Sequence, residues 1–140
     1  MNSIMDELRL KRYRDKINYI IDKIKDIPLK PTNDLEKDGI FYRLQTSIEA
    51  MIDLIAMIVK DLGLPVKDDV SNISEVIKKR NIDPKLGEEL RRANGLRNIL
   101  VHRYNEVEEE IVLNSIPNIK QLLFKWLDII EEILGEISQS

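Results

Sequence analysis

Apolar residues recur at intervals of three and four along nearly the whole chain, which is the period of an α-helix rather than of a half-buried β-strand. The pattern predicts an all-α fold, an antiparallel bundle of four main helices and one short helix. We expect residues 1–140 to form a single domain, because the chain is long enough for one hydrophobic core and too short for two.

Two long helices are predicted first. One apolar stripe covers 10–27 and stops where prolines follow, and a second covers 41–62 with heptad spacing until Gly63 ends it. Asn33 or Asp34 is able to cap the second helix. Because the connection between the two helices is short, they should lie antiparallel.

A short helix and a longer one should follow. Asn72 could cap the short helix, with Glu75 reaching back to complete a capping box. Asp83 and Pro84 then offer an N-cap followed by proline at the first helical position, which is a start signal for the fourth helix. This helix should run from Pro84 to the region of Tyr104.

The C-terminal part is predicted as two helical pieces. An acidic run at 106–110, expected to be a solvated face, leads into a short helical stretch. Pro117 should separate that stretch from a last helix at 119–137. Trp126 lies on the apolar stripe of the last helix, so we expect it in the core or at a dimer interface.

Composition restricts the compartment and the chemistry. The chain has no cysteine, so it offers neither a disulfide framework nor a thiolate metal site. No stretch approaches the roughly 18 apolar residues of a membrane span, and the N-terminus becomes charged before any apolar run of signal length. We therefore expect a soluble, cytoplasmic protein without a membrane partner. The net charge of −3 does not by itself indicate nucleic-acid binding.

The fourth predicted helix has a local charge pattern that the net charge hides. No carboxylate occurs between Glu89 and Glu106, whereas that interval holds four arginines and the only histidine of the chain, His102. Arg97 occupies a position of the apolar stripe where an apolar residue is due. Either it lies at the edge of the stripe and directs its charge to solvent or to a carboxylate on another helix, or it belongs to a functional site.

A polar face flanks this stripe. On a helical projection Arg91, Asn94, Asn98 and His102 cluster beside it, with Asn98 and His102 one turn apart. The face has hydrogen-bond donors and no carboxylate, so it is suited to hold an anion. Histidine exchanges protons near neutral pH without special surroundings, so any acid–base chemistry should involve His102.

A ten-residue segment of this helix resembles the signature of the HEPN superfamily. It reads Gly95-Leu96-Arg97-Asn98-Ile99-Leu100-Val101-His102-Arg103-Tyr104. The arginine is followed after four residues by the histidine, and the tyrosine two residues later is typical of the HepT-like form. The resemblance covers most of the chain, because 41–62 is similar to the family's second helix, and the loop, short helix and motif helix follow in the family's order.

The resemblance implies a HEPN helical bundle with metal-independent endoribonuclease activity and no cofactor, typically the toxin of a type VII-like toxin–antitoxin pair. Arg97 and His102 match the family's catalytic positions, and Asn98 matches the polar position after the arginine. The family's partner is an MNT-type nucleotidyltransferase antitoxin. It can inactivate the toxin by transferring AMP to the motif tyrosine, which is matched here by Tyr104.

The residue types fit that chemistry on physical grounds. Cleaving RNA without a metal requires proton transfer at the 2′-hydroxyl and at the leaving 5′-oxygen, and donors for the phosphate. His102 could serve as acid or base, and Arg97 has forked donors. One protomer lacks a second acid, so we expect a homodimer in which two motifs share one cleft. Supporting contacts to RNA are expected from Asn98, Arg91, Asn94 and Arg103.

Two other functions use the same residues. A HEPN-type module could bind RNA, a nucleotide or its partner through this face without cutting, and a helical dimer could use the face for structure alone. A di-metal bundle is disfavoured, because that chemistry uses a glutamate three residues before histidine, and the residue three before His102 is Ile99.

Overall fold

The computed structural model describes residues 6–101 and 106–138, with the backbone but not the side chains of 106–108. Within these residues the chain forms five helices and no strand: α1 (Glu7–Ile24), α2 (Asp34–Asp61), α3 (Asp69–Arg80), α4 (Pro84–Val101) and α5 (Glu106–Ile137). The prediction of an all-α bundle is confirmed.

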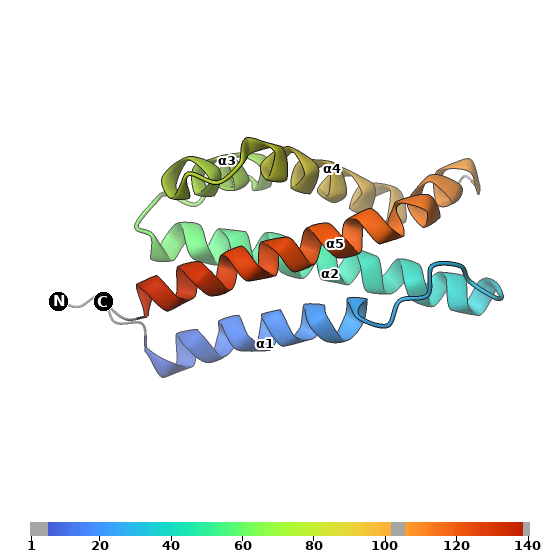
Figure 1. Ribbon diagram of the computed structural model, residues 1–140, viewed down its shortest axis with the longest axis horizontal. Helices are drawn as coiled ribbons and strands as arrows, with labels where there is room; N and C mark the ends of the chain where they lie inside the picture. Colours follow the sequence, from blue (N-terminus) through green and yellow to red (C-terminus); the bar gives the residue numbers. More distant parts are fainter. Residues whose placement is uncertain (1–5, 102–105, 139–140) are drawn as a thin grey trace.

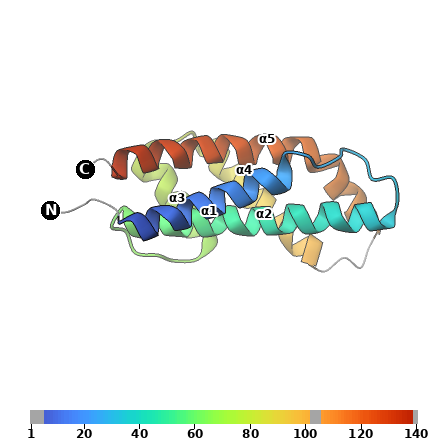
Figure 2. The ribbon, with the colours of Figure 1, turned by 90° about the horizontal axis from the view of Figure 1, so that it is seen from below.

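The central helix of the bundle is α2, which packs against each of the other four helices. α1 and α2 lie antiparallel and side by side, as predicted, and the start of α1 and the end of α5 lie at the same end of the bundle (Figure 1). Figure 2, seen from below, shows α4 on the far side of α2 and α5 from α1. Side chains on the far side of α2 therefore meet α4, the helix of the predicted motif.

Both ends of α2 follow from the sequence. The Asn33 side chain accepts a hydrogen bond from the Glu36 backbone N–H at 2.8 Å, and the Glu36 carboxylate accepts one from the Thr32 N–H at 3.0 Å. At the other end Gly63 has a φ of 79°, and its N–H donates to the Lys60 carbonyl at 3.0 Å. The predicted cap and the predicted stop are confirmed.

The predicted stripes form the core. α1 ends at Ile24, and Ile27, the last residue of its stripe, is buried in the connection that follows. Trp126 is fully buried, and its indole N–H donates to the Leu86 carbonyl at 3.1 Å, so α5 is joined to the first turn of α4. Within the described residues, no helix combines the length and apolar character needed to cross a membrane.

The start of α3 differs from the prediction. Asp68, not Asn72, is the N-cap: its side chain accepts a hydrogen bond from the Ser71 N–H at 2.8 Å, and this bond lowers the pKa of Asp68. Asn72 is buried inside the helix, where its amide binds the backbone N–H and carbonyl of Lys67 at 2.8 and 3.0 Å. The predicted capping box is therefore wrong, because Asn72 secures the preceding loop instead.

The predicted break in the C-terminal part is also wrong, because α5 is continuous and Pro117 lies inside it. Proline cannot donate a hydrogen bond to the carbonyl four residues earlier. Its ring is exposed, however, and Val112 and Ile119 on either side of it are buried in the core. Apolar packing on both sides of the proline thus holds the helix together.

One residue of the acidic run makes a specific contact instead of facing solvent only. The Glu109 carboxylate accepts a hydrogen bond from Nζ of Lys37 on α2 at 3.2 Å. This bond raises the pKa of Lys37. The start of α5 is thereby joined to the start of α2.

α3 and α4 approach each other closely at Gly87. A Cβ atom at this position would lie 2.9 Å from Cγ1 of Ile77 and 3.4 Å from Cγ2 of Ile73. Any larger residue would push Ile77 aside or the two helices apart. Gly87 therefore sets the distance between α3 and α4.

Candidate functional site

The helix that carries the predicted motif begins as expected. The Asp83 side chain accepts a hydrogen bond from the Lys85 backbone N–H at 3.0 Å, and Pro84 occupies the first helical position. The bond from Trp126 to the Leu86 carbonyl then holds this end of α4 against α5. The position of the start of α4 relative to α5 is therefore set by packing.

Part of the predicted site lies outside the described residues. α4 is described to Val101, whereas His102, Arg103 and Tyr104 fall within 102–105. The described part of α4 contains Arg97 and the predicted supporting residues Arg91, Asn94 and Asn98.

Arg97 lies on the side of α4 that faces α2. Its side chain is 25% exposed, and its Nη1 lies 3.9 Å from Oε2 of Glu49, whose side chain is 41% exposed. This distance exceeds that of a hydrogen bond, so Glu49 leaves the guanidinium donors of Arg97 available for another acceptor among the residues that the structure describes. Arg97 thus lies at the edge of the core with its charge directed toward a carboxylate on another helix, and it remains able to bind an anion.

Nothing in the sequence pattern pointed to Glu49 as part of the site. The motif face has no carboxylate of its own, but α2 places Glu49 beside Arg97, and α3 places Asp69 beside Asn94. The local potential is therefore less positive than the helix alone predicts. The periodicity shows which residues share a face of one helix, and the carboxylates come from two other helices.

Arg91 and Asn94 both face α3. Arg91 Nη1 donates to Oγ of Ser74 at 3.4 Å, and Asn94 Nδ2 donates to Oδ2 of Asp69 at 3.3 Å. Oδ1 of Asn94 is buried and has no hydrogen-bond partner in the described part of the chain. These two predicted supporting residues join α4 to α3.

Asn98 faces solvent instead. It is exposed, as is Gly95 three residues before it. On a helical projection Asn98 lies about 100° from Arg97. The structure therefore separates these two residues: Arg97 is directed to α2, and a ligand that reaches both must pass over the edge of α4.

Glu49 also borders a hollow of about 390 Å³ between α1 and α2. The other lining residues are Asp15, Lys16 and Tyr19 from α1 and Thr46, Ala50 and Asp53 from α2. Lys16 and Asp53 form an ion pair across it at 3.4 Å. Space for a ligand thus exists on the side of Glu49 toward α1.

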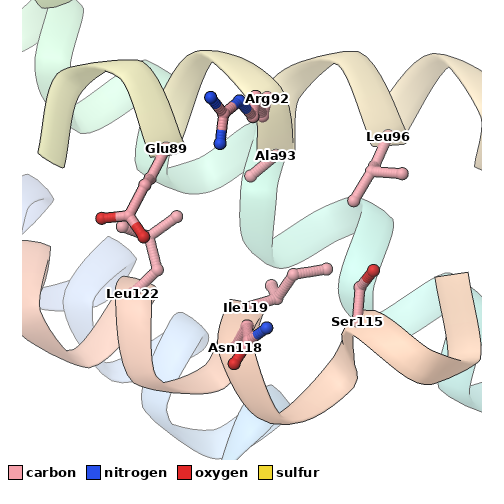
Figure 3. A pocket seen from close by; sticks show the side chains of 8 residues that line it. All are labelled: Glu89, Arg92, Ala93, Leu96, Ser115, Asn118, Ile119 and Leu122. Carbon is pink, nitrogen blue, oxygen red and sulfur yellow. The ribbon is translucent and has the colours of Figure 1, made fainter. Parts of the chain in front are cut away.

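A second hollow, of about 280 Å³, lies between α4 and α5 (Figure 3). Its apolar lining consists of Ala93, Leu96, Ile119 and Leu122, and its polar lining of Glu89, Arg92, Ser115 and Asn118. Arg92 and Arg97 project about 140° apart on α4. This hollow therefore lies on another flank of the helix and does not include Arg97.

Comparison with known proteins connects this geometry to a family. Residues 9–133 match the family model described as Ribonuclease HepT-like. A protein of Archaeoglobus fulgidus named "Putative RNase" is 45% identical, over 93% of this chain and 98% of its own length. A second protein of that organism with the same name is 34% identical, over 82% of this chain and 88% of its own.

Two solved structures have a similar fold. The tri-AMPylated HEPN toxin of Shewanella oneidensis, in complex with MNT antitoxin, has a TM-score of 0.67 at 23% identity, covering 91% of this chain and 99% of its own. A structure of a toxin–antitoxin with AMP-PNP has a TM-score of 0.65 at 23% identity, covering 90% of this chain and 99% of its own. The bundle described above is therefore of the HEPN type, as predicted.

Proposed function

Because the chain belongs to the Ribonuclease HepT-like family, we propose that it is a metal-independent endoribonuclease and the toxin of a type VII-like toxin–antitoxin pair. The observation that carries this proposal is the placement of Arg97. Its guanidinium is partly exposed between α4 and α2, 3.9 Å from Glu49, with donors left over for a ligand. Arginine donors in such a position suit a phosphate group.

In the proposed reaction Arg97 binds the scissile phosphate and His102 transfers a proton. The 2′-hydroxyl loses its proton and attacks phosphorus, and the 5′-oxygen leaves with a proton, so that the product carries a 2′,3′-cyclic phosphate. Arg97 stabilises the additional negative charge of the transition state. These steps require no metal ion and no cofactor. Supporting contacts to RNA are assigned to Asn98, Arg91, Asn94 and Arg103.

A homodimer completes the proposed site. A two-fold arrangement with the α4 helices facing each other would bring two copies of Arg97 and His102 into one cleft. Asn98 and Gly95 are exposed on this face of α4, and Gly95 has no side chain. A second copy of the chain could therefore approach the helix closely here.

The proposed partner is an MNT-type nucleotidyltransferase antitoxin. The structural likeness to a tri-AMPylated HEPN toxin in complex with MNT antitoxin supports this assignment. Tyr104 is the candidate acceptor of AMP. The helical period of the sequence predicts Tyr104 about 20° from Arg97, so an added phosphate would compete with RNA for the same guanidinium.

The test is incubation of the purified chain with cellular RNA in EDTA, beside the His102→Ala variant. We expect cleavage by the wild type, 2′,3′-cyclic phosphate ends, and loss of cleavage in the variant. RNA that is bound equally by both proteins and cut by neither would instead support the non-catalytic binding module. Mass spectrometry after co-expression with an MNT-type protein tests the partner: an inhibited complex with unmodified Tyr104 would indicate inhibition by masking.

A further inference from the structure

The carboxylate that faces Arg97 has a position that suits proton transfer. We propose that Glu49 is the general base that takes the proton from the 2′-hydroxyl, an assignment that rests on the proposed ribonuclease function. Its Oε2 lies 3.9 Å from Nη1 of Arg97, and its side chain is 41% exposed. Among the described side chains, it is the only carboxylate within 4 Å of that guanidinium.

Glu49 would supply the proton acceptor of the reaction from the described part of one protomer, without a second histidine. Cleavage requires one group that accepts a proton and one that donates a proton, and the whole chain of 140 residues contains a single histidine. A carboxylate oxygen is a hydrogen-bond acceptor, so Glu49 has the chemistry to receive a proton from a hydroxyl group. With Glu49 as base, the imidazole of His102, from either protomer, is left to act as the acid.

The geometry of the substrate determines how far the general base can lie from Arg97. The attacking 2′-oxygen forms its new bond to the same phosphorus whose non-bridging oxygens Arg97 binds. A base hydrogen-bonded to that 2′-oxygen must therefore lie within a few ångströms of the guanidinium. The separation of 3.9 Å between Arg97 and Glu49 meets this requirement. A tight bidentate pair would leave neither group available for the substrate.

Glu49 is also accessible from a second side. It borders the hollow of about 390 Å³ between α1 and α2, next to Thr46 and Tyr19. Lys16, the cation of the same hollow, is already paired with Asp53 at 3.4 Å, and Glu49 is therefore not its partner in the described structure.

The proposed step transfers one proton to Glu49 and one proton from His102. The proton of the 2′-hydroxyl moves to a Glu49 carboxylate oxygen while the 2′-oxygen bonds to phosphorus. The bond from phosphorus to the 5′-oxygen breaks, and the 5′-oxygen takes a proton from His102. Proton exchange with water then removes the proton from Glu49 and returns one to His102. Glu49 touches the reacting atom in this step, and Arg97 stabilises the charge that develops.

Glu49→Gln tests the assignment, with Asp53→Asn as the matched control. Asp53 lies one turn further along α2, lines the same hollow and loses the same charge, but its ion pair is with Lys16. We expect Glu49→Gln to lower kcat by about 100-fold or more, the usual loss for a general base, with KM changed by less than about threefold. Asp53→Asn should cleave RNA at the wild-type rate.

Binding of a non-cleavable RNA with 2′-O-methyl groups supplies a second measurement that needs no turnover. Glu49→Gln should bind it as tightly as the wild type or more tightly, because Arg97 loses a competing carboxylate. Weaker binding together with slower cleavage would overturn the base assignment, since Glu49 would then only position Arg97. Glu49→Asp, which keeps the carboxylate, should retain more activity than Glu49→Gln.

The outcomes separate this proposal from the proposed function. If wild type and Glu49→Gln cut RNA at equal rates, the base assignment fails and the ribonuclease function stands. If the wild type cuts no RNA, the ribonuclease function and the base assignment fail together. Equal loss in Glu49→Gln and Asp53→Asn would also overturn the assignment, because the charge of the hollow rather than one carboxylate would be responsible.

Discussion

α2 meets two arginines from other helices, and the two contacts differ in kind. Near its C-terminal end Asp61 binds Arg9 of α1, with 3.0 Å between Nε and Oδ2 and side-chain exposures of 19% for Asp61 and 20% for Arg9. In its middle Glu49 lies 3.9 Å from Arg97 of α4, with exposures of 41% and 25%. The distance between Arg9 and Asp61 is thus short and both side chains are partly buried. The distance between Arg97 and Glu49 is longer, and the Glu49 side chain is more exposed to solvent.

The Arg9 contact is part of a satisfied network. The Tyr13 hydroxyl donates to the same Asp61 oxygen at 2.5 Å, and the Arg9 guanidinium lies over the Tyr13 ring at 5.5 Å. Burial raises the pKa of Tyr13, and the bond to Asp61 raises it further. Burial acts to lower the pKa of Arg9, but the hydrogen bond to Asp61, the charge of Asp61 and the contact with Tyr13 together outweigh burial, so the net shift is upward.

The difference between the pairs separates a structural arginine from one that is available to a ligand. Arg9 donates to Asp61 and, at 3.5 Å, to the Met57 carbonyl, so it joins α1 to α2. Arg97 has one long contact among the described side chains and keeps most of its donors. The exposed fraction of the arginine would not by itself distinguish the two contacts, because the Arg9 side chain is 20% exposed and the Arg97 side chain 25%.

The largest expected effect comes from removing the available arginine. Arg97→Ala should lower the rate of RNA cleavage by about 100-fold or more, since it loses the donors that stabilise the charged transition state. Its free energy of unfolding should change by less than about 1 kcal/mol, because the long contact to Glu49 contributes little. Cleavage assays and urea unfolding measure the two quantities. If Arg97→Ala still cleaved RNA but had lost stability, Arg97 would be a structural residue like Arg9.

Removing the acceptor of the enclosed network should act in the opposite way. Asp61→Ala leaves the Tyr13 hydroxyl and the Arg9 guanidinium without their shared acceptor, so we expect a loss of about 2 kcal/mol in the free energy of unfolding. Cleavage per folded molecule should be unchanged. Urea unfolding followed by circular dichroism measures the stability, and unchanged stability would show that solvent replaces the acceptor.

Tyr13→Phe should have a smaller effect, about 1 kcal/mol, and a characteristic pH dependence. Because the folded-state pKa of Tyr13 is raised, the unfolded chain loses this proton first as the pH passes about 10, and the stability of the wild type should fall above that pH. Tyr13→Phe has no hydroxyl to ionise at this position, so its stability should fall less steeply as the pH rises. Unfolding curves at pH 8 to 11 test this, and parallel declines would contradict it.

The smallest effect is expected for the stability of Glu49→Gln. Exposed ion pairs typically contribute less than about 1 kcal/mol, and the long Glu49–Arg97 contact should contribute less than about 0.5 kcal/mol. Thermal unfolding beside Asp53→Asn gives a direct comparison. A loss as large as that of Asp61→Ala would show that the two pairs are equivalent and that Glu49 is structural.

Much of the fold could be predicted from periodicity and caps. The stripes of α1 and α2, the Asn33 cap and the stop at Gly63 are local features that each helix carries in its own sequence. The errors arose where tertiary packing outweighed a local signal. Asn72 reads as a cap but secures a loop, and Pro117 reads as a break but lies in a helix held by the core on both sides.

The site could be predicted only in part for the same reason. Arg97 was identifiable because it interrupts an apolar stripe on one helix. Glu49 was not, because its relation to Arg97 depends on how α2 and α4 face each other, which no single-helix pattern contains. The contacts of Arg91 and Asn94 with α3 are likewise products of tertiary packing.

The close approach at Gly87 has a mechanical consequence. With Ile77 only 2.9 Å from where a Cβ would stand, and with Arg91 and Asn94 bonded to the same helix, α3 cannot slide along α4 without steric overlap. α3 and α4 are thus joined at two places, by the close approach at Gly87 and by these hydrogen bonds. We therefore expect α3 to follow α4 in any displacement that widens the gap between Arg97 and α2.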